Sequence, residues 1–409
     1  YKRQIDNNGS IEILDDSVKE TLTEKINEMS DNALRVLGIA YKNTENIGDN
    51  VENDLIFTGL VGIIDPPKKN VDKSIAACKK AGIKVRMITG DHLKTASSIA
   101  REIGILTDGK VIDGETLDKL SDEEYFEMVD DIQVYARVKP EQKMRIVETL
   151  KQKGEIVSMT GDGVNDAPAL KNASIGVAMG SGTDVAKESG DMIIQDDNFE
   201  TIVTAIREGR KIYDNIKRFV KFQVSTNVGA ILTIVGTSIF MLPVPFNPVQ
   251  LLWINIVMDG PPAQTLGMEG SERNIMTRQP ETGDILNKKV LIKIFIAGLV
   301  MAIGSIALFS YKLAIGASQK QAMTVAFTLF VMYQLFNAYN SKSNSAKKST
   351  YLYLAIIACF ILQVLIVYIP ELQIIFRTTS IGLTDWILIF IIAATILVSN
   401  RIANKIVVE

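Results

Sequence analysis

Cysteine and histidine are scarce in this chain of 409 residues, which contains two cysteines and one histidine. Cys78 and Cys359 lie far apart in regions of opposite polarity, so the sequence does not indicate a disulfide framework, and a reducing compartment suits the polar region. The single histidine, His92, stands at the expected start of a helix, and we predict no catalytic role for it.

A strong net charge is also lacking, because 44 lysines and arginines nearly balance 47 aspartates and glutamates, giving −3 at pH 7. This balance carries no electrostatic signature of nucleic-acid binding, and we predict no nucleic-acid partner. The sequence opens on Tyr1 with neither an initiator methionine nor a signal peptide. We therefore expect it to be the C-terminal portion of a longer protein.

Charged and apolar residues occupy different halves of the chain. Residues up to about 218 carry most of the charge, and the remainder consists of long apolar runs separated by short polar loops. Most of these runs approach the ~20 residues that cross a bilayer. The six candidate spans lie at about 219–242, 248–267, 289–313, 321–339, 351–370 and 384–400.

Basic residues are concentrated in alternate loops between these spans. The loops near 243–247 and 371–383 hold only Arg377. The loops near 268–289 and 341–349 hold Arg273, Arg278, Lys288, Lys289, Lys342, Lys347 and Lys348. The positive-inside rule then places the polar half, the basic loops and the C-terminus on the cytoplasmic side of the membrane.

The polar half alternates short apolar strands with amphipathic helices. Predicted strands lie at 83–88, 156–159, 175–179 and 192–194, with a helix at 141–150 and another after residue 92. Nearly continuous apolar strands separated by helices predict a parallel sheet covered on both faces. Ligands of such sheets bind at the carboxyl ends of the strands, where both Thr-Gly-Asp triplets of this sequence fall.

Residues 1–58 predict a different unit, with one amphipathic helix and an apolar strand from Arg35 to Ala40. This segment is too short to form a full core. We expect it to be the end of an interrupted domain.

The stretch "MTGDGVNDAPAL" (159–170) contains a candidate metal site. Asp162 and Asp166 follow a strand end, with Asn165 between them and glycines that permit a tight turn. Two carboxylates and an amide at a strand end suit a hard cation that keeps part of its water, which is how proteins usually hold Mg²⁺.

A phosphate site is indicated by the other triplet and by a helical lysine. Thr89 and Gly90 offer a hydroxyl and backbone N–H groups to phosphoryl oxygens, and Lys143 could neutralise the charge of a metaphosphate-like transition state. Each fragment has an ordinary alternative, since a lone TGD is often a turn and a lone helical lysine is usually solvated. Their order on one parallel α/β pattern favours phosphoryl transfer.

The strings "MITGDHLKTA", "VYARVKPEQK", "MTGDGVNDAPALKNASIGVAMGSGTDVAKE" and "DDNF" resemble the phosphorylation domain of P-type cation pumps, from about residue 30 to residue 340. The resemblance implies a haloacid-dehalogenase fold with Mg²⁺ and ATP as cofactors. It implies Mg²⁺ coordination by Asp162, supported by Asn165 and Asp166. The catalytic residues that it implies are Thr89, Gly90, Asp91, Lys143 and Asp65.

The same resemblance implies nucleotide contacts by Arg35 in "ALRVLGIA" and Arg137 in "YARV". Where the family usually has an arginine after "DPP", this chain has Lys68. A lysine replaces the planar guanidinium fork with a point charge, so a nucleotide contact at Lys68 departs from the family pattern.

The DKTGT segment, on which such pumps form a phosphoaspartate, does not occur in the sequence, and the fragments "VDKS" and "LDKL" lack its glycine and threonine. By the family's topology this segment precedes the nucleotide domain. We therefore expect the actuator domain, the DKTGT segment and membrane helices 1–4 to belong to an N-terminal part outside this sequence. The chain alone should not turn over ATP.

The stretch "LLWINIVMDGPP" places an acid where hydrocarbon is expected. Asn255 and Asp259 are four residues apart and should share one helical face, and the proline pair after Gly260 should interrupt the helix and free carbonyls. An intramembrane carboxylate beside an amide and carbonyls predicts an oxygen-ligand cation site. The alternative is a structural pair at a helix kink. Asn227 in the preceding span could be a third ligand or a helix-packing amide.

"VQLLWINIVMDGPPAQTLG" resembles the sixth helix of calcium pumps, and "MDGPPAQ" is closest to the secretory-pathway Ca²⁺/Mn²⁺ group. Ala230 and Met258 stand where two-ion calcium pumps have oxygen ligands, which implies one ion per cycle. Ca²⁺ takes 6–8 oxygens. The resemblance implies that a glutamate and carbonyls of the fourth helix, outside this sequence, complete the site.

Together these observations predict an α/β haloacid-dehalogenase-like (Rossmann-type) phosphorylation domain joined to an all-α bundle of six transmembrane helices. The expected divisions are 1–58, the end of a nucleotide-binding domain; 59–212, the phosphorylation domain; and 213–409, transmembrane helices 5–10. The expected function is ATP-driven Ca²⁺ export through a phosphoaspartate, with proton counter-transport, by a monomeric pump in a bacterial plasma membrane. Alternatives are a pump for another cation such as Mn²⁺, a membrane-anchored phosphatase, and a non-catalytic fragment that regulates a partner.

Overall fold

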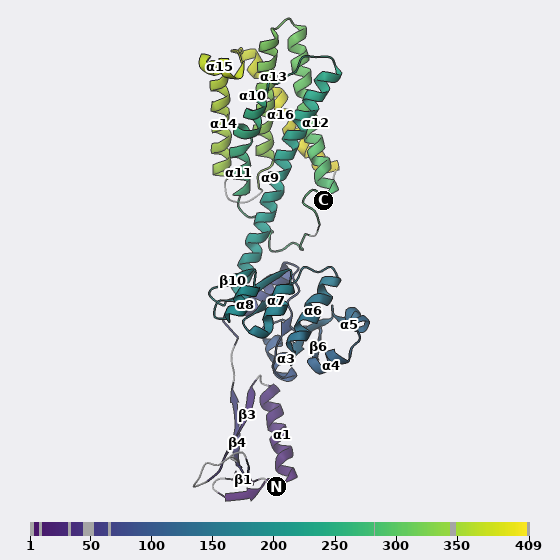
Figure 1. Cartoon of the computed structure of the whole chain (residues 1–409), viewed down its shortest axis with the longest axis vertical. Helices are drawn as coiled ribbons and strands as arrows, with labels where there is room; N and C mark the ends of the chain where they lie inside the picture. Colours follow the sequence, from purple (N-terminus) through teal and green to yellow (C-terminus); the bar gives the residue numbers. More distant parts are fainter. Residues whose placement is uncertain are drawn as a thin grey trace. The chain divides into compact units, whose positions relative to one another are not determined.

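The computed structural model describes residues 4–7, 10–31, 34–43, 53–63, 67–281, 283–343 and 349–406 (Figure 1). The chain divides into two compact units, the first comprising Tyr1–Ala205 with Met276–Gln279 and the second Ile206–Ile275 with Pro280–Glu409. Each unit is described by itself. The domain boundaries expected at residues 58 and 212 stay predictions.

The N-terminal part of the first unit is a four-stranded sheet with one helix. Its strands are β1 (Gln4–Asn7), β2 (Ser10–Ile13), β3 (Arg35–Tyr41) and β4 (Ile56–Ile63), in the order β2-β1-β4-β3, and its helix is α1 (Asp16–Asp31). The predicted helix and the predicted strand at Arg35 are confirmed. Large apolar side chains of this sheet, such as Ile13, Leu37 and Ile63, are exposed. The sheet therefore buries little of its own apolar surface, as expected for a segment too short to form a core.

The rest of the first unit contains six parallel strands in two sheets. One sheet has the order β5-β7-β6 and the other β10-β9-β8. The strands are β5 (Met87–Ile88), β6 (Lys110–Asp113), β7 (Ile132–Ala136), β8 (Ser158–Gly161), β9 (Ile175–Met179) and β10 (Met192–Ile194). The helices are α2 (Val71–Lys80), α3 (Leu93–Glu102), α4 (Gly114–Lys119), α5 (Asp122–Met128), α6 (Pro140–Gln152), η1 (Val164–Asp166), α7 (Ala167–Asn172) and α8 (Asp184–Ser189).

Two details differ from the sequence prediction. The predicted single parallel sheet is two three-stranded sheets, and the predicted strand at 83–88 is reduced to Met87–Ile88. Met87 pairs with Val134, so residues 83 and 84 lie beyond Ile132, the first residue of β7. A strand cannot continue where its neighbour has not yet begun. Ile83 instead donates its N–H to Cys78 O at 2.9 Å, which closes the end of α2.

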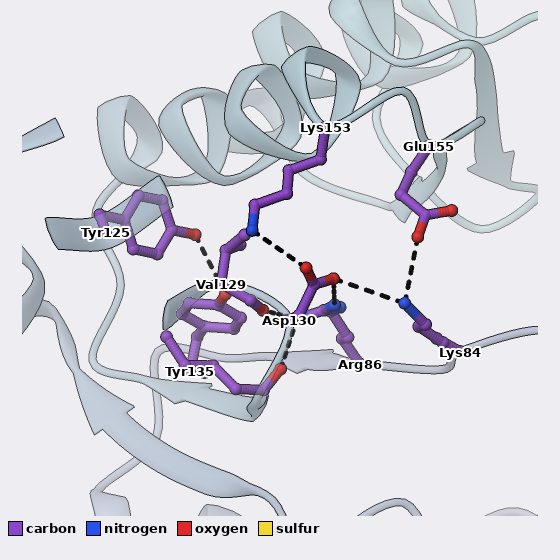
Figure 2. Close-up of polar contacts among 9 residues, drawn as sticks. Lys84, Arg86, Tyr125, Val129, Asp130, Tyr135, Lys153 and Glu155 are labelled. Carbon is purple, nitrogen blue, oxygen red and sulfur yellow. Dashed lines mark hydrogen bonds and ion pairs between the residues drawn. The ribbon is translucent and has the colours of Figure 1, made fainter. Parts of the chain in front are cut away.

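An ion-pair cluster joins three elements near the start of β5 (Figure 2). Asp130 accepts contacts from Lys153 at 3.1 Å, Lys84 at 3.4 Å and Arg86 at 3.7 Å. The Arg86 guanidinium also donates to the carbonyls of Val129 and Ile132. Burial raises the pKa of Asp130, but the bonds from Lys153 and Lys84 outweigh burial and lower this pKa below its usual value of 3.8. The cluster therefore fixes the ends of α5 and α6 against β5 while the carboxylate is ionised.

The second unit is a bundle of helices (Figure 1). The boundary between the units falls within α9 (Phe199–Ile239). The other segments are α10 (Pro248–Leu252), the π-helix η2 (Trp253–Met258), α11 (Gly260–Gly267), α12 (Lys288–Ala314), α13 (Gln319–Asn340), α14 (Thr350–Tyr368), α15 (Pro370–Phe376) and α16 (Leu383–Ile406).

Four helices in the described part of the chain are long and apolar enough to cross a membrane, namely α9, α12, α13 and α14. The other two predicted spans differ in form. Residues 248–267 form three short helical segments, and the apolar stretch of α16, Leu383–Ser399, is shorter. In the most apolar stretch of α13, 83% of the residues are buried, against 28% in those of α12 and α14, so α13 occupies the middle of the bundle.

The proline pair does not interrupt the helix where the sequence predicts. Pro261 and Pro262 stand in the first turn of α11, where a missing N–H costs least, and the irregularity comes earlier as the π-helix η2. Asp259 donates its N–H to Ile254 O, five residues back, and Ala263 donates to Asp259 O. Short π-helices of this kind frequently mark functional sites.

Candidate functional site

The loop after β5 holds the first Thr-Gly-Asp triplet in a closed hydrogen-bonded turn. Thr89 Oγ1 donates to Asp91 Oδ2 at 2.8 Å, and the Asp91 N–H donates back to Thr89 Oγ1 at 3.1 Å. The Thr89 N–H donates to Tyr135 O at 2.9 Å, which ties the loop to the end of β7. A Cβ added at Gly90 would meet nothing within 4 Å, so the turn faces open space in which a ligand can approach.

Arg137 supports this loop through its backbone. Its N–H donates to Asp91 O at 3.1 Å, and the next N–H, from Val138, donates to Thr89 O at 3.2 Å. Arg137 has a φ of 48°, a left-handed conformation that is uncommon outside glycine and often found at functional sites. The structure thus brings predicted nucleotide-binding and catalytic residues into contact at one sheet edge.

The second triplet begins within β8 and ends at Asp162, and an ion pair to Asp166 holds the loop that follows. Lys143 Nζ of α6 lies 2.5 Å from Asp166 Oδ1, and the two side chains are only 16% and 10% exposed. The other Asp166 oxygen accepts the Gly163 N–H at 3.2 Å. A Cβ at Gly161 would lie 2.4 Å from the Asp166 Cβ, so this position requires glycine. The sequence therefore holds Asp166 and Lys143 in one fixed geometry.

Asp162 and Asn165 of the same loop are exposed, whereas Asp166 is buried. The Asp162 carbonyl accepts the Thr183 N–H at 2.8 Å, and a Cβ at Gly182 would lie 2.8 Å from this oxygen. The backbone is thus fixed while the Asp162 carboxylate stays accessible. The described residues contain no group of three His, Cys, Asp or Glu side chains that could enclose a metal. Mg²⁺ in phosphoryl-transfer sites usually takes one or two carboxylates and completes its shell with water and phosphate, so this donor set fits Mg²⁺.

The remaining predicted site residues of the first unit are Asp65, Arg35 and Lys68. Asp65 lies outside the described residues, as does the side chain of Arg35, whose backbone begins β3. Lys68 Nζ donates to Asp197 O at 2.8 Å. Lys68 and Asp162 both line a cavity of about 410 Å³, so the Lys68 charge is near the predicted Mg²⁺ ligand.

In the bundle, Asp259 is buried and has one protein partner. Gln334 Nε2 of α13 donates to Asp259 Oδ1 at 2.9 Å. Asp259 Oδ2 and Gln334 Oε1 have no hydrogen-bond partner among the described residues. Both side chains are at most 1% exposed. Two buried oxygens with free lone pairs, one of them on a carboxylate, can serve as the first ligands of a cation.

Asn255 and Asn227 differ from Asp259 in burial. Both asparagines are exposed, on η2 and α9 respectively, although Asn255 is four residues from Asp259. The roles of both asparagines stay predictions.

Gln334 is the residue that sequence reasoning missed. The string "MYQLFNAYN" shows amides in an apolar helix, but no spacing rule relates them to an acid 75 positions earlier. Asn337, one turn further, donates to Ser225 Oγ of α9 at 2.8 Å. The available signal in the sequence was an amide side chain within an apolar helix, since such a side chain needs a hydrogen-bond partner if the helix is buried.

Comparison with known proteins agrees with both halves of this description. The family model "haloacid dehalogenase-like hydrolase" matches residues 14–174, and "Cation transporting ATPase, C-terminus" matches residues 243–406. The chain is 39% identical over 397 residues to the calcium-transporting ATPase of Bacillus subtilis, covering 93% of this chain and 44% of that protein.

Two eukaryotic relatives are similar to the same extent. Calcium-transporting ATPase 1 of Saccharomyces cerevisiae is 39% identical over 412 residues (96% of this chain, 43% of the relative), and calcium-transporting ATPase type 2C member 1 of Bos taurus is 37% identical over 391 residues (93% and 40%). The chain spans less than half the length of each of these relatives. With both domain models matched in order along one chain, the protein belongs to the P-type cation-transporting ATPases and is similar to their calcium-transporting members.

Proposed function

We propose that the chain is the C-terminal part of an ATP-driven Ca²⁺ pump that works through a phosphoaspartate. The observation that carries the proposal is the buried Asp259 carboxylate, which Gln334 holds through one oxygen while the other stays unpaired among the described residues. A phosphatase with a membrane anchor has no use for such a carboxylate, which is costly inside a bilayer. The relatives named calcium-transporting ATPases support Ca²⁺ as the cargo.

In this proposal the phosphorylated aspartate belongs to a DKTGT segment outside the sequence. Lys143, oriented by Asp166, places its ammonium where negative charge grows during phosphoryl transfer. The Gly90 N–H binds phosphoryl oxygens, and the Thr89 hydroxyl, which in this structure donates to Asp91, turns away from Asp91 to donate to them. Mg²⁺ would be held by Asp162 with Asn165 and Asp166, and would supply neutralising charge to the phosphate oxygens.

The transported ion binds at Asp259 and Gln334, which supply two free oxygens of the 6–8 that Ca²⁺ takes. Ala230 and Met258 are buried and offer no side-chain oxygen, which supports one ion per cycle. The remaining ligands, in this proposal, come from the exposed Asn255 side of η2 and from helices outside the sequence. Protons return in exchange, and the first unit and the C-terminus face the cytoplasm of a bacterial cell.

Replacing Asp259 with asparagine in the complete pump tests the proposal. The D259N pump should lose Ca²⁺-activated phosphorylation from ATP, while phosphorylation from inorganic phosphate, which needs only the cytoplasmic site, should persist. The readout is acid-stable incorporation of labelled phosphate at graded Ca²⁺ concentrations, with Mn²⁺ in parallel to compare the two cargoes.

Asp284→Asn is the matched control, because it makes the same chemical change at an exposed acid outside the bundle core. This variant should keep the wild-type Ca²⁺ response. Unchanged Ca²⁺ activation in D259N would show that Asp259 does not bind the transported ion and would overturn the proposal, and absence of Ca²⁺-activated phosphorylation in the unmodified protein would favour the phosphatase alternative.

A further inference from the structure

Several buried polar atoms of the bundle lack a protein partner, and four of them lie on adjoining segments. Trp253 Nε1, Asp259 Oδ2, Gln334 Oε1 and Gln363 Oε1 have no hydrogen-bond partner among the described residues. Buried polar groups rarely stay unpaired, and ordered water is the usual partner when protein atoms do not serve. The set contains one donor and three acceptors, a combination that water satisfies because it both donates and accepts.

Polar positions on α14 extend away from Asp259 at helical spacing. Cys359 Sγ lies 3.7 Å from Val257 O of the π-helix, two residues before Asp259. Gln363 lies one turn further along the same face of α14, about 6 Å away. Its amide donates to Thr328 Oγ1 of α13 at 3.2 Å, and both side chains are fully buried. A second polar level thus lies between α13 and α14, beyond the carboxylate.

Polar positions on α10 extend toward Asp259 from the other end. Asn247 and Gln250 are buried and donate to Phe376 O, the last residue of α15, at 2.9 and 3.1 Å. Trp253 follows Gln250 by one turn, and its ring lies 5.0 Å from that of Phe376. Trp253 therefore lies along the helix between Gln250, which contacts the end of α15, and Asp259, and its N–H has no partner among the described residues.

A third level occurs on α13. Thr324, one turn from Thr328, accepts the Thr379 N–H at 3.1 Å, and Thr378 donates to Ile366 O at 2.8 Å. Both threonines that bind through their hydroxyls, Thr324 and Thr378, are fully buried. Polar groups thus recur at each level from the segment after α15 to the carboxylate. We call Trp253, Thr328, Cys359 and Gln363 the polar seam.

We propose that the polar seam holds a line of water molecules that reaches Asp259 from the α15 end of the bundle, between α10–η2, α13 and α14. The ligand of this site is water, bound by the Trp253 N–H and the glutamine carbonyls. The line approaches Asp259 from a side other than the exposed face that carries Asn255. It rests on the unpaired atoms and the buried polar groups beside them, so it does not depend on whether the chain transports Ca²⁺.

Cys359 is a natural reporter for this line, since the chain has only two cysteines and Cys78 lies in the other unit. The probe is Ag⁺, which binds thiolates, is narrow enough to follow single waters and is excluded from lipid by its charge. The Cys78→Ser protein in lipid nanodiscs is exposed to Ag⁺ and is then unfolded in the presence of a maleimide. The maleimide labels the thiols that Ag⁺ has not blocked, and mass spectrometry measures the labelled fraction. Although Cys359 is 1% exposed, it should be blocked in the folded protein.

Two comparisons make the result decisive. A cysteine at the exposed apolar position Ile361 of α14, where lipid is the expected neighbour (Cys78→Ser, Cys359→Ala, Ile361→Cys), should be blocked about tenfold more slowly than Cys359, because thiolate and Ag⁺ both avoid lipid. Gln363→Leu, which removes the polar level, should slow blocking of Cys359 about tenfold, and Leu362→Ala on the exposed side of α14 should not. Equal rates at Cys359 and Ile361→Cys, or blocking of Cys359 only after unfolding, would overturn the proposal. The first comparison needs no change at Gln363, so it decides the matter even when Gln363→Leu does not fold.

Discussion

The buried ion pair between Lys312 of α12 and Asp385 of α16 offers a quantitative test of how the bundle is held together. The two side chains are only 9% and 3% exposed, and Asp385 Oδ2 also accepts the Gly382 N–H at 3.4 Å. Removing one charge of a buried pair leaves the other uncompensated, which typically costs about 3–5 kcal/mol. Lys312→Met keeps the side-chain volume and removes the charge. We expect a loss of stability in this range.

The expected loss is large enough for thermal unfolding of the purified protein in detergent, followed by intrinsic fluorescence. For a unit of this size, about 1 kcal/mol corresponds to roughly 2–4 °C, so the bundle transition should fall by about 6–20 °C. Asp385→Asn should have a similar effect, because it leaves Lys312 buried without its carboxylate. The double variant, which is neutral at both positions, should recover most of the loss, since replacing a whole buried pair is often neutral or stabilising.

Glu208→Gln provides the control. The ion pair between Glu208 and Lys211 is more exposed than the Lys312–Asp385 pair, and its residues are spaced i, i+3 on one helix. Pairs of this kind contribute about 0.3–0.5 kcal/mol, so the transition should hardly move. A loss below about 1 kcal/mol in Lys312→Met would refute the reasoning, because it would show that the pair is hydrated in the folded bundle. So would a double variant as unstable as the sum of both single variants.

Three further predictions concern the first unit. Gly161→Ala should displace Asp166 and abolish phosphoryl transfer by the complete pump while leaving the unit folded, as judged by circular dichroism; unchanged turnover would contradict the close approach seen here. Lys143→Met should destabilise the unit by roughly 1–3 kcal/mol, measured in urea, because the Asp166 carboxylate then keeps, among the described residues, only the Gly163 N–H; Lys143→Arg should lose less stability. Since the pKa of Asp130 is lowered in the folded state, its stabilising contribution is present above the usual value of 3.8 and is lost as pH falls below it; Asp130→Asn should flatten acid unfolding over that range, and an unchanged acid limb would exclude Asp130 as a cause.

Local rules predicted where the candidate loops of the first unit lie, while the chemical roles of their residues stay predictions. The Thr89–Asp91 and Asp162–Asp166 loops follow strand ends as expected, and α6 carries Lys143 to Asp166 because its apolar residues fix which side faces the sheets. The division into two sheets was not predictable. Strand length in β5 depends on where β7 begins, which is a property of pairing between distant segments and not of the residues 83–88 themselves.

The bundle was harder to predict at the level of side chains. The Asp259–Gln334 hydrogen bond joins residues 75 positions apart, and apolar runs carry little information about which helices become neighbours. The proline pair correctly marked an irregular segment, but its backbone consequence appears as η2 before the prolines, because Pro261 and Pro262 fit the first turn of α11. Asn255 is exposed and Asp259 is buried, a difference that their spacing of four residues does not predict.

The burial of α13 bears on how the bundle enters the membrane. A helix wrapped by protein on nearly every side can carry Thr328, Gln334 and Asn337, because lipid never touches them. Inserted alone, the same helix would expose these groups to hydrocarbon and gain less from the bilayer than α12 or α14. Stable insertion of α13 therefore depends on the helices that precede and follow it in the chain. These helices must assemble cooperatively around α13, because the bundle cannot insert one span at a time.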